Sequence, residues 1–435
     1  NSVTNSEKFC FEFQKILISR IILTIMIDRT ILELVEECIG LKAVTLITGA
    51  RQVGKTTLCK ELVRKHGFNY VSLAEAQDRE EANADPLYFL KKHTCPLIID
   101  EVQRAPALFD YLEAEVDRKM FETDSNEGMY VLTGSQAYAL MQGVTQSMAG
   151  RLAIVEMSPL SLSEIIGRPE VPFLADIDEN ISRGEEHVMS HDEVFSMIVR
   201  GMYPELYQKP QTRTRQFYSD YVQTYIARDI SQMINVRDKT KFLNFMSALA
   251  SLTGQELVYD NVASDLGIDS KTVKSWTSIL VAGGIIRLIQ PYVPGSNMKS
   301  VKRRPKMYFC DTGLACYLSK IDSANSLDAH LRKGHMVETF IVNEIIKTYT
   351  NRGEPGNFYY FRDKNMNEID LIIVKDGKMH LIECKTGMMF TKEDVKSFDK
   401  VSHAEYEIGP SCIVCLTDRA YSVKEGVRVL PVTSI

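Results

Sequence analysis

The stretch from Gly49 to Thr56 reads Gly-Ala-Arg-Gln-Val-Gly-Lys-Thr and decides the fold of the first part of this chain. An apolar run at 43–47 predicts a buried strand before it, and a helical pattern follows from Lys55 to about Lys65. Glycines let backbone N–H groups turn inward around phosphate oxygens, and the start of the helix adds partial positive charge. Since both flanking elements are present, the stretch predicts a nucleotide-phosphate loop rather than a chance match in a glycine turn.

Every residue of this loop, together with the residue after it, is a candidate nucleotide contact. The candidates are Gly49, Ala50, Arg51, Gln52, Val53, Gly54, Lys55, Thr56 and Thr57. Lys55 can reach the β- and γ-phosphates of ATP and serve catalysis there, and the Thr56 hydroxyl can bind Mg²⁺. The pattern therefore predicts ATP and Mg²⁺ as cofactors.

A second predicted strand ends in two acids, as expected of an enzyme that hydrolyses ATP. Residues 96–99 read Pro-Leu-Ile-Ile, and Asp100 and Glu101 follow directly. Ligands of parallel sheets collect at the carboxyl ends of the strands. We expect Asp100 to hold Mg²⁺, directly or through water, and Glu101 to orient and deprotonate the attacking water. An acidic strand end that merely faces solvent is the less favoured alternative, because the phosphate loop lies upstream.

Two further positions are candidates for the same chemistry. The strand-like run at 129–135 ends in Ser135, which can contact the γ-phosphate or the attacking water. Arg151 precedes another predicted strand at 152–155. It can neutralise charge on the phosphoryl group, either in its own chain or across a subunit boundary. A surface ion pair explains Arg151 nearly as well.

Together these motifs resemble a large group of prokaryotic AAA+-type ATPases that carry a C-terminal domain of unknown function. Besides the loop and the strand with its acid pair, the resemblance rests on Leu-Thr-Gly-Ser at 132–135, Ala-Gly-Arg at 149–151, Pro-Leu-Ser at 159–161, Gly-Met-Tyr-Pro-Glu at 201–205, residues 221–230 and Tyr-Phe-Cys-Asp-Thr-Gly-Leu at 308–314. It covers nearly everything from residue 27 onward. It implies ATP binding and hydrolysis, and little about the substrate.

Composition bounds the remaining possibilities. The chain has 435 residues, of which 25% are charged and 45% hydrophobic, as in ordinary soluble globular proteins of two or three domains. A net charge of −6 argues against a uniformly basic nucleic-acid binder and leaves local basic patches open. The apolar stretch at 16–27 is interrupted, too short to span a bilayer, and lacks a signal-peptide cleavage site. With scattered cysteines, these features predict a cytoplasmic protein without a membrane role.

We expect an α/β chain in five segments. They are a peripheral N-terminal extension at 1–25, a P-loop ATPase domain with a parallel sheet at 26–165, an exposed insertion (166–190) and helical lid or linker at 166–236, a winged-helix-like domain at 237–295, and a restriction-endonuclease-like α/β domain at 296–435. In the third segment, Phe217, Tyr218, Tyr221 and Tyr225 have near-helical spacing, which is most simply core packing. Arg228 and Asp229 follow, with a structural ion pair as the default interpretation.

The fourth segment has the outline of a DNA-binding module. Helical patterns at 239–252, 261–266 and 270–282 precede a turn and a strand. On the third helix, Lys271, Thr272 and Lys274 can meet DNA, although many winged-helix units only pack against neighbours. A basic run at 299–306 includes Lys302, Arg303 and Arg304, which either grip phosphates or form a solvated linker.

The fifth segment carries the residue quartet of the PD-(D/E)xK nuclease superfamily, which it resembles. Glu338 lies on a helical stretch, Asp370 near the start of a predicted strand, and Glu383 and Lys385 on one face of the next. In that superfamily the two strand carboxylates share Mg²⁺, which activates water, while the lysine steadies the attacking hydroxide. Related domains keep the fold for binding alone. A buried acid–lysine pair that holds sheet to helix is the competing explanation.

The leading hypothesis is thus an ATPase that acts on DNA, with an uncertain metal-dependent nuclease module. The alternative is a nucleotide-driven switch that docks a protein partner without cutting DNA. A role for Arg151 across a boundary would require a homo-oligomer.

Overall fold

The computed structural model describes residues 27–134, 148–224, 239–293, 304–354, 356–401 and 406–435. Several predictions concern positions outside these ranges: the extension at 1–25 and the residues Ser135, Tyr225, Arg228, Asp229, Lys302 and Arg303. They stay predictions. Within the described ranges, no helix is both long and apolar enough to cross a bilayer.

The first sheet is parallel throughout, as predicted, and has the strand order β2-β3-β4-β1-β5. Its strands are β1 (Val44–Thr48), β2 (Asn69–Ser72), β3 (Leu97–Asp100), β4 (Tyr130–Thr133) and β5 (Leu152–Glu156). All five residues of β1 are buried, which explains why its sequence is a continuous apolar and β-branched run. The helices around it are α2 (Ile31–Leu41), α3 (Lys55–His66), α4 (Ala76–Ala84), α5 (Pro86–Lys92), η1 (Val102–Arg104) and α6 (Leu108–Thr123).

The segment at 166–190 is not the exposed insertion that its polar composition predicts. It lies between α8 (Leu162–Ile166) and α10 (His191–Arg200), and it contains α9 (Ile177–Glu186). Phe173 is fully buried, and the Asn180 amide donates to the backbone oxygen of Ser434, 2.8 Å away. The segment packs in two places: the Phe173 N–H donates to the Thr348 hydroxyl oxygen at 3.0 Å, and α9 lies against the last residues of the chain.

The predicted helices downstream are present. They are α11 (Pro204–Gln208), α12 (Thr214–Tyr221), α14 (Lys239–Ala250), α15 (Tyr259–Leu266) and α16 (Ser270–Ala282). Phe217, Tyr218 and Tyr221 of α12 are buried, as core packing requires. Asp269 caps α16, since its side chain accepts from the backbone N–H groups of Lys271 and Thr272.

A second sheet runs through the rest of the chain in the order β14-β15-β13-β11-β10-β9-β7-β8-β6, with β12 beside β11. Its strands are β6 (Gln255–Glu256), β7 (Ile286–Pro291), β8 (Lys306–Phe309), β9 (Asn357–Arg362), β10 (Glu368–Lys375), β11 (Lys378–Cys384), β12 (Glu407–Ile408), β13 (Ser411–Cys415), β14 (Tyr421–Lys424) and β15 (Val427–Pro431). β7 pairs with β8 on one side and with β9 on the other. The predicted boundary at 295/296 therefore separates two strands that pair with each other.

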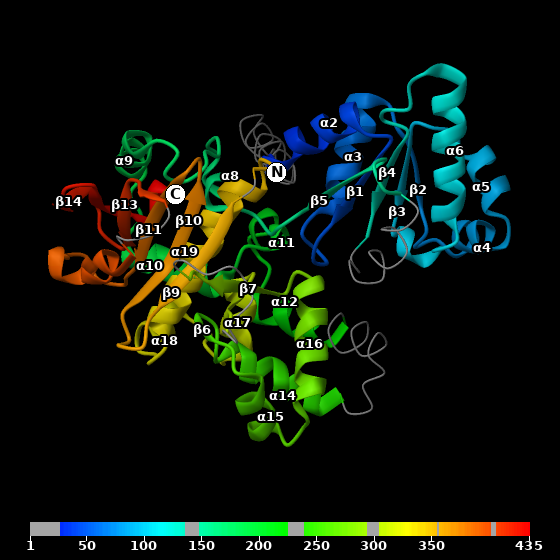
Figure 1. Cartoon of the computed structure of the whole chain (residues 1–435). Helices are drawn as coiled ribbons and strands as arrows, with labels where there is room; N and C mark the ends of the chain where they lie inside the picture. The colour runs from blue at the N-terminus through cyan, green and yellow to red at the C-terminus, as the bar shows by residue number, and fades with distance from the viewer. Residues whose placement is uncertain (1–26, 135–147, 225–238, 294–303, 355, 402–405) are drawn as a thin grey trace, which may run out of the picture.

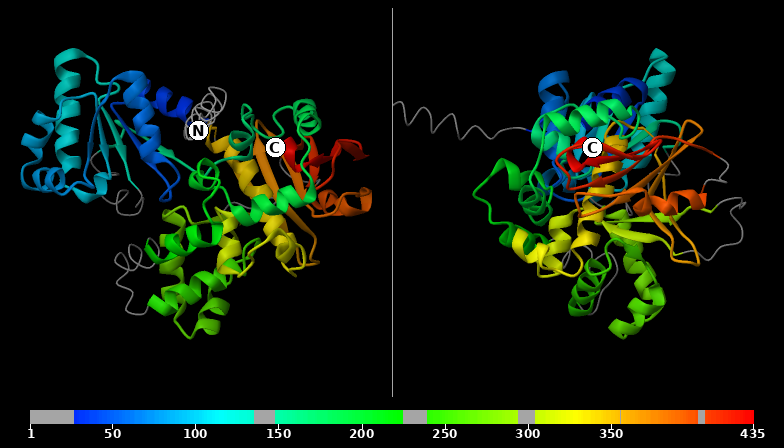
Figure 2. Two further views of the ribbon diagram at one scale, coloured as in Figure 1. Left: turned by 180° about the vertical axis from the view of Figure 1, so that it is seen from behind. Right: turned by 90° about the vertical axis from the view of Figure 1, so that its left-hand side faces the viewer.

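The helices of this part are α17 (Thr312–Leu318), α18 (Ala324–Asp328), α19 (Lys333–Thr350), η3 (Lys392–Val401) and η4 (Val432–Ser434). Figures 1 and 2 show the first sheet at one end of the molecule, the second sheet at the other, and α14–α16 projecting beside them. One apolar cluster continues from α2 and α3 through α10 and α12 to α19. The two ends thus share buried contacts.

Three motifs of the family resemblance, at 159–161, 201–205 and 308–314, form buried contacts of this kind. The buried Asp311 carboxylate accepts from the Met202 N–H at 2.7 Å, the Tyr218 hydroxyl at 2.7 Å and the Leu314 N–H at 2.8 Å. The buried Lys347 ammonium of α19 donates to the Leu160 carbonyl, 2.6 Å away. These segments therefore have structural roles that join neighbouring parts of the chain.

Candidate functional site

The loop between β1 and α3 has a backbone that requires glycine at both ends. Gly49 has φ 133°, and a Cβ atom there would lie 2.2 Å from the carbonyl oxygen of Met157. Gly54 has φ 106° and caps the N-terminus of α3. Since L side chains rarely adopt such φ values, these two glycines permit the loop to curve around its own N–H groups.

Lys55 closes the loop in this structure. Its ammonium donates to the carbonyl oxygens of Gly49 at 2.8 Å and Ala50 at 2.7 Å, and only 7% of the residue is exposed. Burial lowers the pKa of Lys55 to about 8, although the charges of Glu101 and Asp100 act in the opposite direction. Its hydrogen-bond partners are neutral carbonyls, and phosphate oxygens of a nucleotide could replace them.

Asp100 is the point where hydroxyl groups from three elements meet. Its Oδ2 atom accepts from the Thr56 hydroxyl at 3.1 Å and from the Tyr70 hydroxyl at 2.8 Å. Its Oδ1 atom accepts from the Thr133 hydroxyl. The predicted Mg²⁺ ligands Thr56 and Asp100 are thus side by side, and Tyr70 and Thr133 are partners that sequence reasoning did not single out. These oxygen donors suit the chemistry of Mg²⁺.

Glu101 is held beside this cluster by two contacts. It has φ 59°, and its N–H donates to the Thr133 hydroxyl oxygen at 3.2 Å. The Gln103 amide donates to Glu101 Oε2 at 2.5 Å. Gln103 was missed because a glutamine two positions after an acid carries no recognisable pattern. It orients the carboxylate that we predict to activate water.

Arg29 supports the loop from the other side and was also missed. Its guanidinium donates to the carbonyl oxygens of Val53 and Ser158, each at 2.7 Å, and to Glu164 Oε1 at 3.1 Å. Both side chains of the Arg29–Glu164 pair are nearly inaccessible to solvent. The pair joins the phosphate loop to the segment that leads into α8.

A cavity of about 390 Å³ adjoins the loop. One wall is the loop with Glu101, and the other comes from α11, α12 and the residues just after it. The lining residues are Arg51, Gln52, Gly54, Lys55, Thr56, Thr57, Glu101, Pro204, Glu205, Gln208, Tyr221 and Thr224. This volume falls within the range of small-molecule sites. A ligand here would contact the helical region as well as the first sheet.

Arg151 does not reach this cavity within its own chain. It precedes β5, whose residue Leu152 pairs in parallel with Val44 at the start of β1, whereas the loop follows the end of β1. Its guanidinium pairs with Asp117 at 2.6 Å and Glu113 at 3.4 Å. In its own chain Arg151 therefore lies at the end of β5 away from the phosphate loop, in an ion pair of the kind that the sequence also allowed. A role across a subunit boundary stays a prediction.

The C-terminal quartet lies on the predicted elements. Glu338 is on α19, Asp370 on β10 and Glu383 on β11, all largely buried, and Lys385 follows β11. The Lys385 ammonium contacts Glu383 Oε1 at 2.5 Å. Burial, and then the charge of Asp370, raise the pKa of Glu383 to about 8.

Lys306 enters this cluster, which corrects one prediction. As the last residue of the basic run at 299–306, it was grouped with residues expected to grip phosphate or stay solvated. Instead it lies on β8, is 2% exposed, and contacts Glu338. Its strand reads Lys-Met-Tyr-Phe and is buried throughout. Lys306 is therefore buried with its strand, unlike the basic residues that precede it in the sequence.

The predicted DNA-contacting residues give a mixed result. Lys271, Lys274 and Arg304 are exposed. The Thr272 hydroxyl donates to Asp269 at 2.6 Å as part of the helix cap, and the Lys274 ammonium lies 5.6 Å from the centre of the Tyr259 ring. Asp260, Asp265 and Asp269 belong to the same two-helix unit. The face around α16 is therefore not strongly basic.

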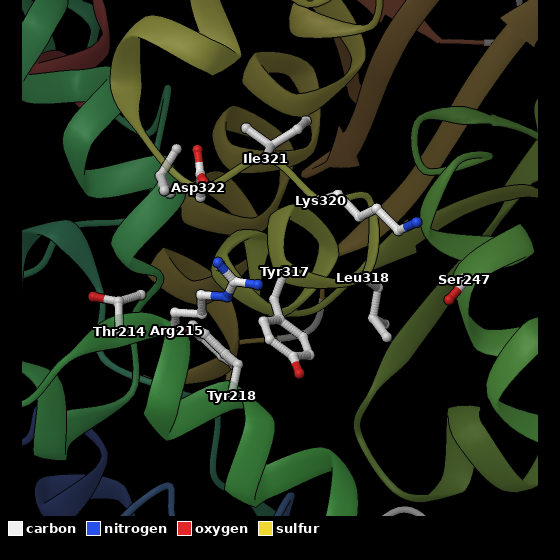
Figure 3. A pocket seen from close by; sticks show the side chains of 11 residues that line it. Thr214, Arg215, Tyr218, Ser247, Tyr317, Leu318, Lys320, Ile321 and Asp322 are labelled. Atoms are coloured by element: carbon white, nitrogen blue, oxygen red, sulfur yellow. The ribbon is translucent and has the colours of Figure 1, made fainter.

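Another cavity, of about 410 Å³, is lined by residues of α10, α12, α14 and α17 and of the segment after α17 (Figure 3). Tyr218, Tyr317 and Ile321 line it together with the exposed charged residues Arg215, Lys320 and Asp322. None of its lining residues belongs to the phosphate-loop cavity. It is a separate hollow of mixed polarity.

Three separate family models match three successive parts of the chain. Residues 41–166 match a model described as an AAA domain. Residues 191–325 and 333–435 match two models, each described as a domain of unknown function. With the loop geometry, the first match supports an AAA-type P-loop ATPase. The other two leave the C-terminal fold and role without an assignment.

Relatives with a curated sequence are uncharacterized proteins of mycobacteria. Rv2008c of Mycobacterium tuberculosis and Mb2031c of Mycobacterium bovis are each 26% identical to this chain over 342 residues, which cover 79% of this chain and 70% of the relative. Among solved structures, a Walker-type ATPase of Pyrococcus abyssi covers 67% of this chain and 96% of its own length, at 14% identity and a TM-score of 0.40. A RuvB mutant of Thermotoga maritima covers 59% and 89%, at 16% identity and a TM-score of 0.27.

Proposed function

We propose that this chain binds ATP with Mg²⁺ and hydrolyses it, with Lys55 and the loop residues on the phosphates and Glu101 as the base. The observation that supports this most is the convergence of Thr56, Tyr70 and Thr133 on Asp100, with Glu101 adjacent. Mg²⁺, when bound, would neutralise charge on the phosphates. Thr56 and Asp100 are the residues that would hold it.

The position of the cavity suggests how ATP would control the rest of the molecule. Glu205, Gln208 and Thr224 line it opposite the loop. Glu205 and Gln208 are on α11, and α11 and α12 belong to the segment that Asp311 joins to α17. We propose that nucleotide binding and hydrolysis change how these helices rest on the first domain. ATP state would then be transmitted to the region that contains α14–α16.

For the macromolecule that responds, we propose DNA, bound by a winged-helix-like unit of α14–α16 with β6, β7 and β8. The support is the order of its elements and the exposure of Lys271, Lys274 and Arg304. Each phosphate contact would make binding weaker as salt rises. The aspartates around α16 favour the second candidate, a nucleotide-driven switch in the cytoplasm that docks a protein partner or a second copy of the chain.

One experiment separates the two candidates. ATP turnover of the full chain is measured with single-stranded DNA, duplex DNA and no DNA, at low and at physiological salt. Stimulation by DNA that falls steeply with salt supports the DNA-acting ATPase. Turnover that is indifferent to both supports the switch. The Lys55→Ala chain is the control, since ATP turnover that survives this change belongs to a contaminant.

The nuclease interpretation of the C-terminal quartet is tested separately. Plasmid DNA is incubated with Mg²⁺ or Mn²⁺ and either the unmodified chain or Asp370→Ala. Nicking by the first and not by the second would assign cleavage to this domain. Identical products from both would assign it to a contaminant. The position of Lys306 leads us to expect no nicking.

A further inference from the structure

The ammonium of Lys306 lies at the centre of the C-terminal carboxylate cluster. It is 2.6 Å from Glu338 Oε1, 2.6 Å from Glu368 Oε1 and 3.2 Å from Asp370 Oδ1. The ammonium donates hydrogen bonds to Glu368 and Asp370 and forms an ion pair with Glu338. The cation thus occupies two acids of the predicted metal quartet, Glu338 and Asp370, together with Glu368.

The same acids have further partners that leave little room for another cation. Glu338 Oε1 also accepts from the Tyr308 hydroxyl at 2.7 Å. The other oxygen of Asp370 accepts from the Cys384 N–H at 2.9 Å. The carboxylates outweigh the burial that opposes its charge, and they hold the pKa of Lys306 well above its usual range.

With Lys306 in place, the acids of the cluster are not spaced as ligands of one metal ion. In the part of the chain that the structure describes, one group of three potential ligands comes close enough to hold an ion, and it consists of Asp78, Glu81 and His93. The quartet is not such a group. Glu383 Oε2 is buried and has no hydrogen-bond partner within the described ranges. One such oxygen falls short of the several oxygen ligands that Mg²⁺ or Ca²⁺ requires.

We propose that Lys306 takes the place of a divalent metal in this cluster. Its ammonium then holds the carboxylates of the C-terminal domain together, and the domain binds no metal there. Lys306 belongs to β8, Glu338 to α19, and Glu368 and Asp370 to β10. The ammonium thus links β8 to α19 and to β10. Removing the ammonium leaves Asp370 without its cation, while Glu368 keeps Arg362 at 3.9 Å and Glu338 keeps His335 at 3.7 Å. A divalent cation then becomes a favourable partner for the three acids.

The test is to titrate the full chain with Mn²⁺ in the absence of nucleotide. Electron paramagnetic resonance measures how much Mn²⁺ is bound. All chains carry Thr56→Ala to remove the Mg²⁺ ligand at the ATP site. The chain with Lys306 intact should take up no Mn²⁺ at the C-terminal cluster. Lys306→Met should gain one Mn²⁺ with a dissociation constant of about 10⁻⁴–10⁻³ M, as weak oxygen-ligand sites show. Lys385→Met is the matched control and should gain none, because Lys385 contacts only Glu383 among the acids.

Two results would overturn the proposal. One is Mn²⁺ uptake by the chain with Lys306 intact that Asp370→Asn abolishes. The other is a folded Lys306→Met chain that takes up no Mn²⁺. If Lys306→Met does not fold, the thermal unfolding of the chain with Lys306 intact decides. An equal unfolding temperature in EDTA and in Mn²⁺ supports the proposal, and a rise in Mn²⁺ that Asp370→Asn removes overturns it. No ATP is present, so the outcome is independent of the proposed ATPase function.

Discussion

The phosphate loop and the C-terminal cluster contain the same residue types in different relationships. Each places a buried lysine near aspartate and glutamate. Lys55 donates to two neutral carbonyl oxygens, whereas Lys306 forms ion pairs with three carboxylates. Consequently the pKa of Lys55 is lowered by burial, while that of Lys306 is raised by its partners in spite of burial.

The difference shows what distinguishes a binding site from a structural tie. A lysine bonded to carbonyls keeps an unneutralised charge and gains from an incoming anion. A lysine surrounded by acids is already neutralised, and its removal costs stability. Sequence motifs alone do not separate the two situations, because they do not identify the partner.

The strongest test of the comparison exchanges one acid in each region. Glu101→Gln should lower ATP turnover by about 10²–10⁴-fold while ATP binding persists, because the base that orients water is lost. Glu383→Gln, the corresponding change in the C-terminal cluster, should leave turnover unchanged. Steady-state kinetics and nucleotide-binding calorimetry measure both. Turnover within a few fold of normal in the Glu101→Gln chain would remove Glu101 from the mechanism.

The next effect concerns the support behind the loop. Arg29→Met should lower the free energy of unfolding by about 3–5 kcal/mol, since it leaves the buried Glu164 carboxylate without its positive partner. Arg304→Met, at an exposed position, should change it by less than about 0.5 kcal/mol. Guanidinium denaturation compares the two chains. Equal midpoints would show that the buried pair contributes nothing.

The third effect is a pH dependence that only the first region should show. Phosphates near Lys55 should raise its pKa above the value of about 8 in the free protein, so ATP binding at pH 8 takes up protons. Because the neutral amine loses its attraction to phosphate, affinity should fall about fivefold between pH 8 and pH 9. Calorimetry in buffers of different ionisation enthalpy measures the proton uptake. Its absence at pH 8 would mean that the Lys55 ammonium does not meet the phosphates.

The smallest effect compares two tyrosines that donate to acids. Tyr308→Phe should lower the free energy of unfolding by about 0.5–1.5 kcal/mol, because its hydroxyl is fully buried against Glu338. Tyr70→Phe should cost less, since Tyr70 is 39% exposed and water can replace its hydroxyl at Asp100. Urea denaturation of both chains provides the comparison. A larger loss of stability for Tyr70→Phe than for Tyr308→Phe would contradict this prediction.

Much of the architecture could be predicted from the sequence. The loop, the strand that ends in Asp100 and the elements that carry Glu338, Asp370 and Glu383 each have a local pattern of period, glycine or terminal acid. The helices around 239–282 also have such patterns. These features are local, and they are the ones that sequence patterns describe.

What escaped prediction depends on contacts between distant segments. Arg29 contacts Glu164, and Lys306 contacts Glu338 and Asp370. Nothing near Lys306 in the sequence shows that its strand turns inward, so its charge was counted with its basic neighbours. The polar segment at 166–190 was expected to be exposed for the same reason, because its partners lie in α19 and at the end of the chain.

The shared sheet also limits how this protein can be divided. A fragment that starts at residue 296 would lose β7, and with it the strand that pairs along β8 and with two residues of β9. Unpaired strand edges readily join other chains and aggregate. We therefore expect that fragment to be poorly behaved on its own, whereas a cut before α14 would keep the hairpin with its sheet. Modularity here follows strand pairing rather than motif boundaries.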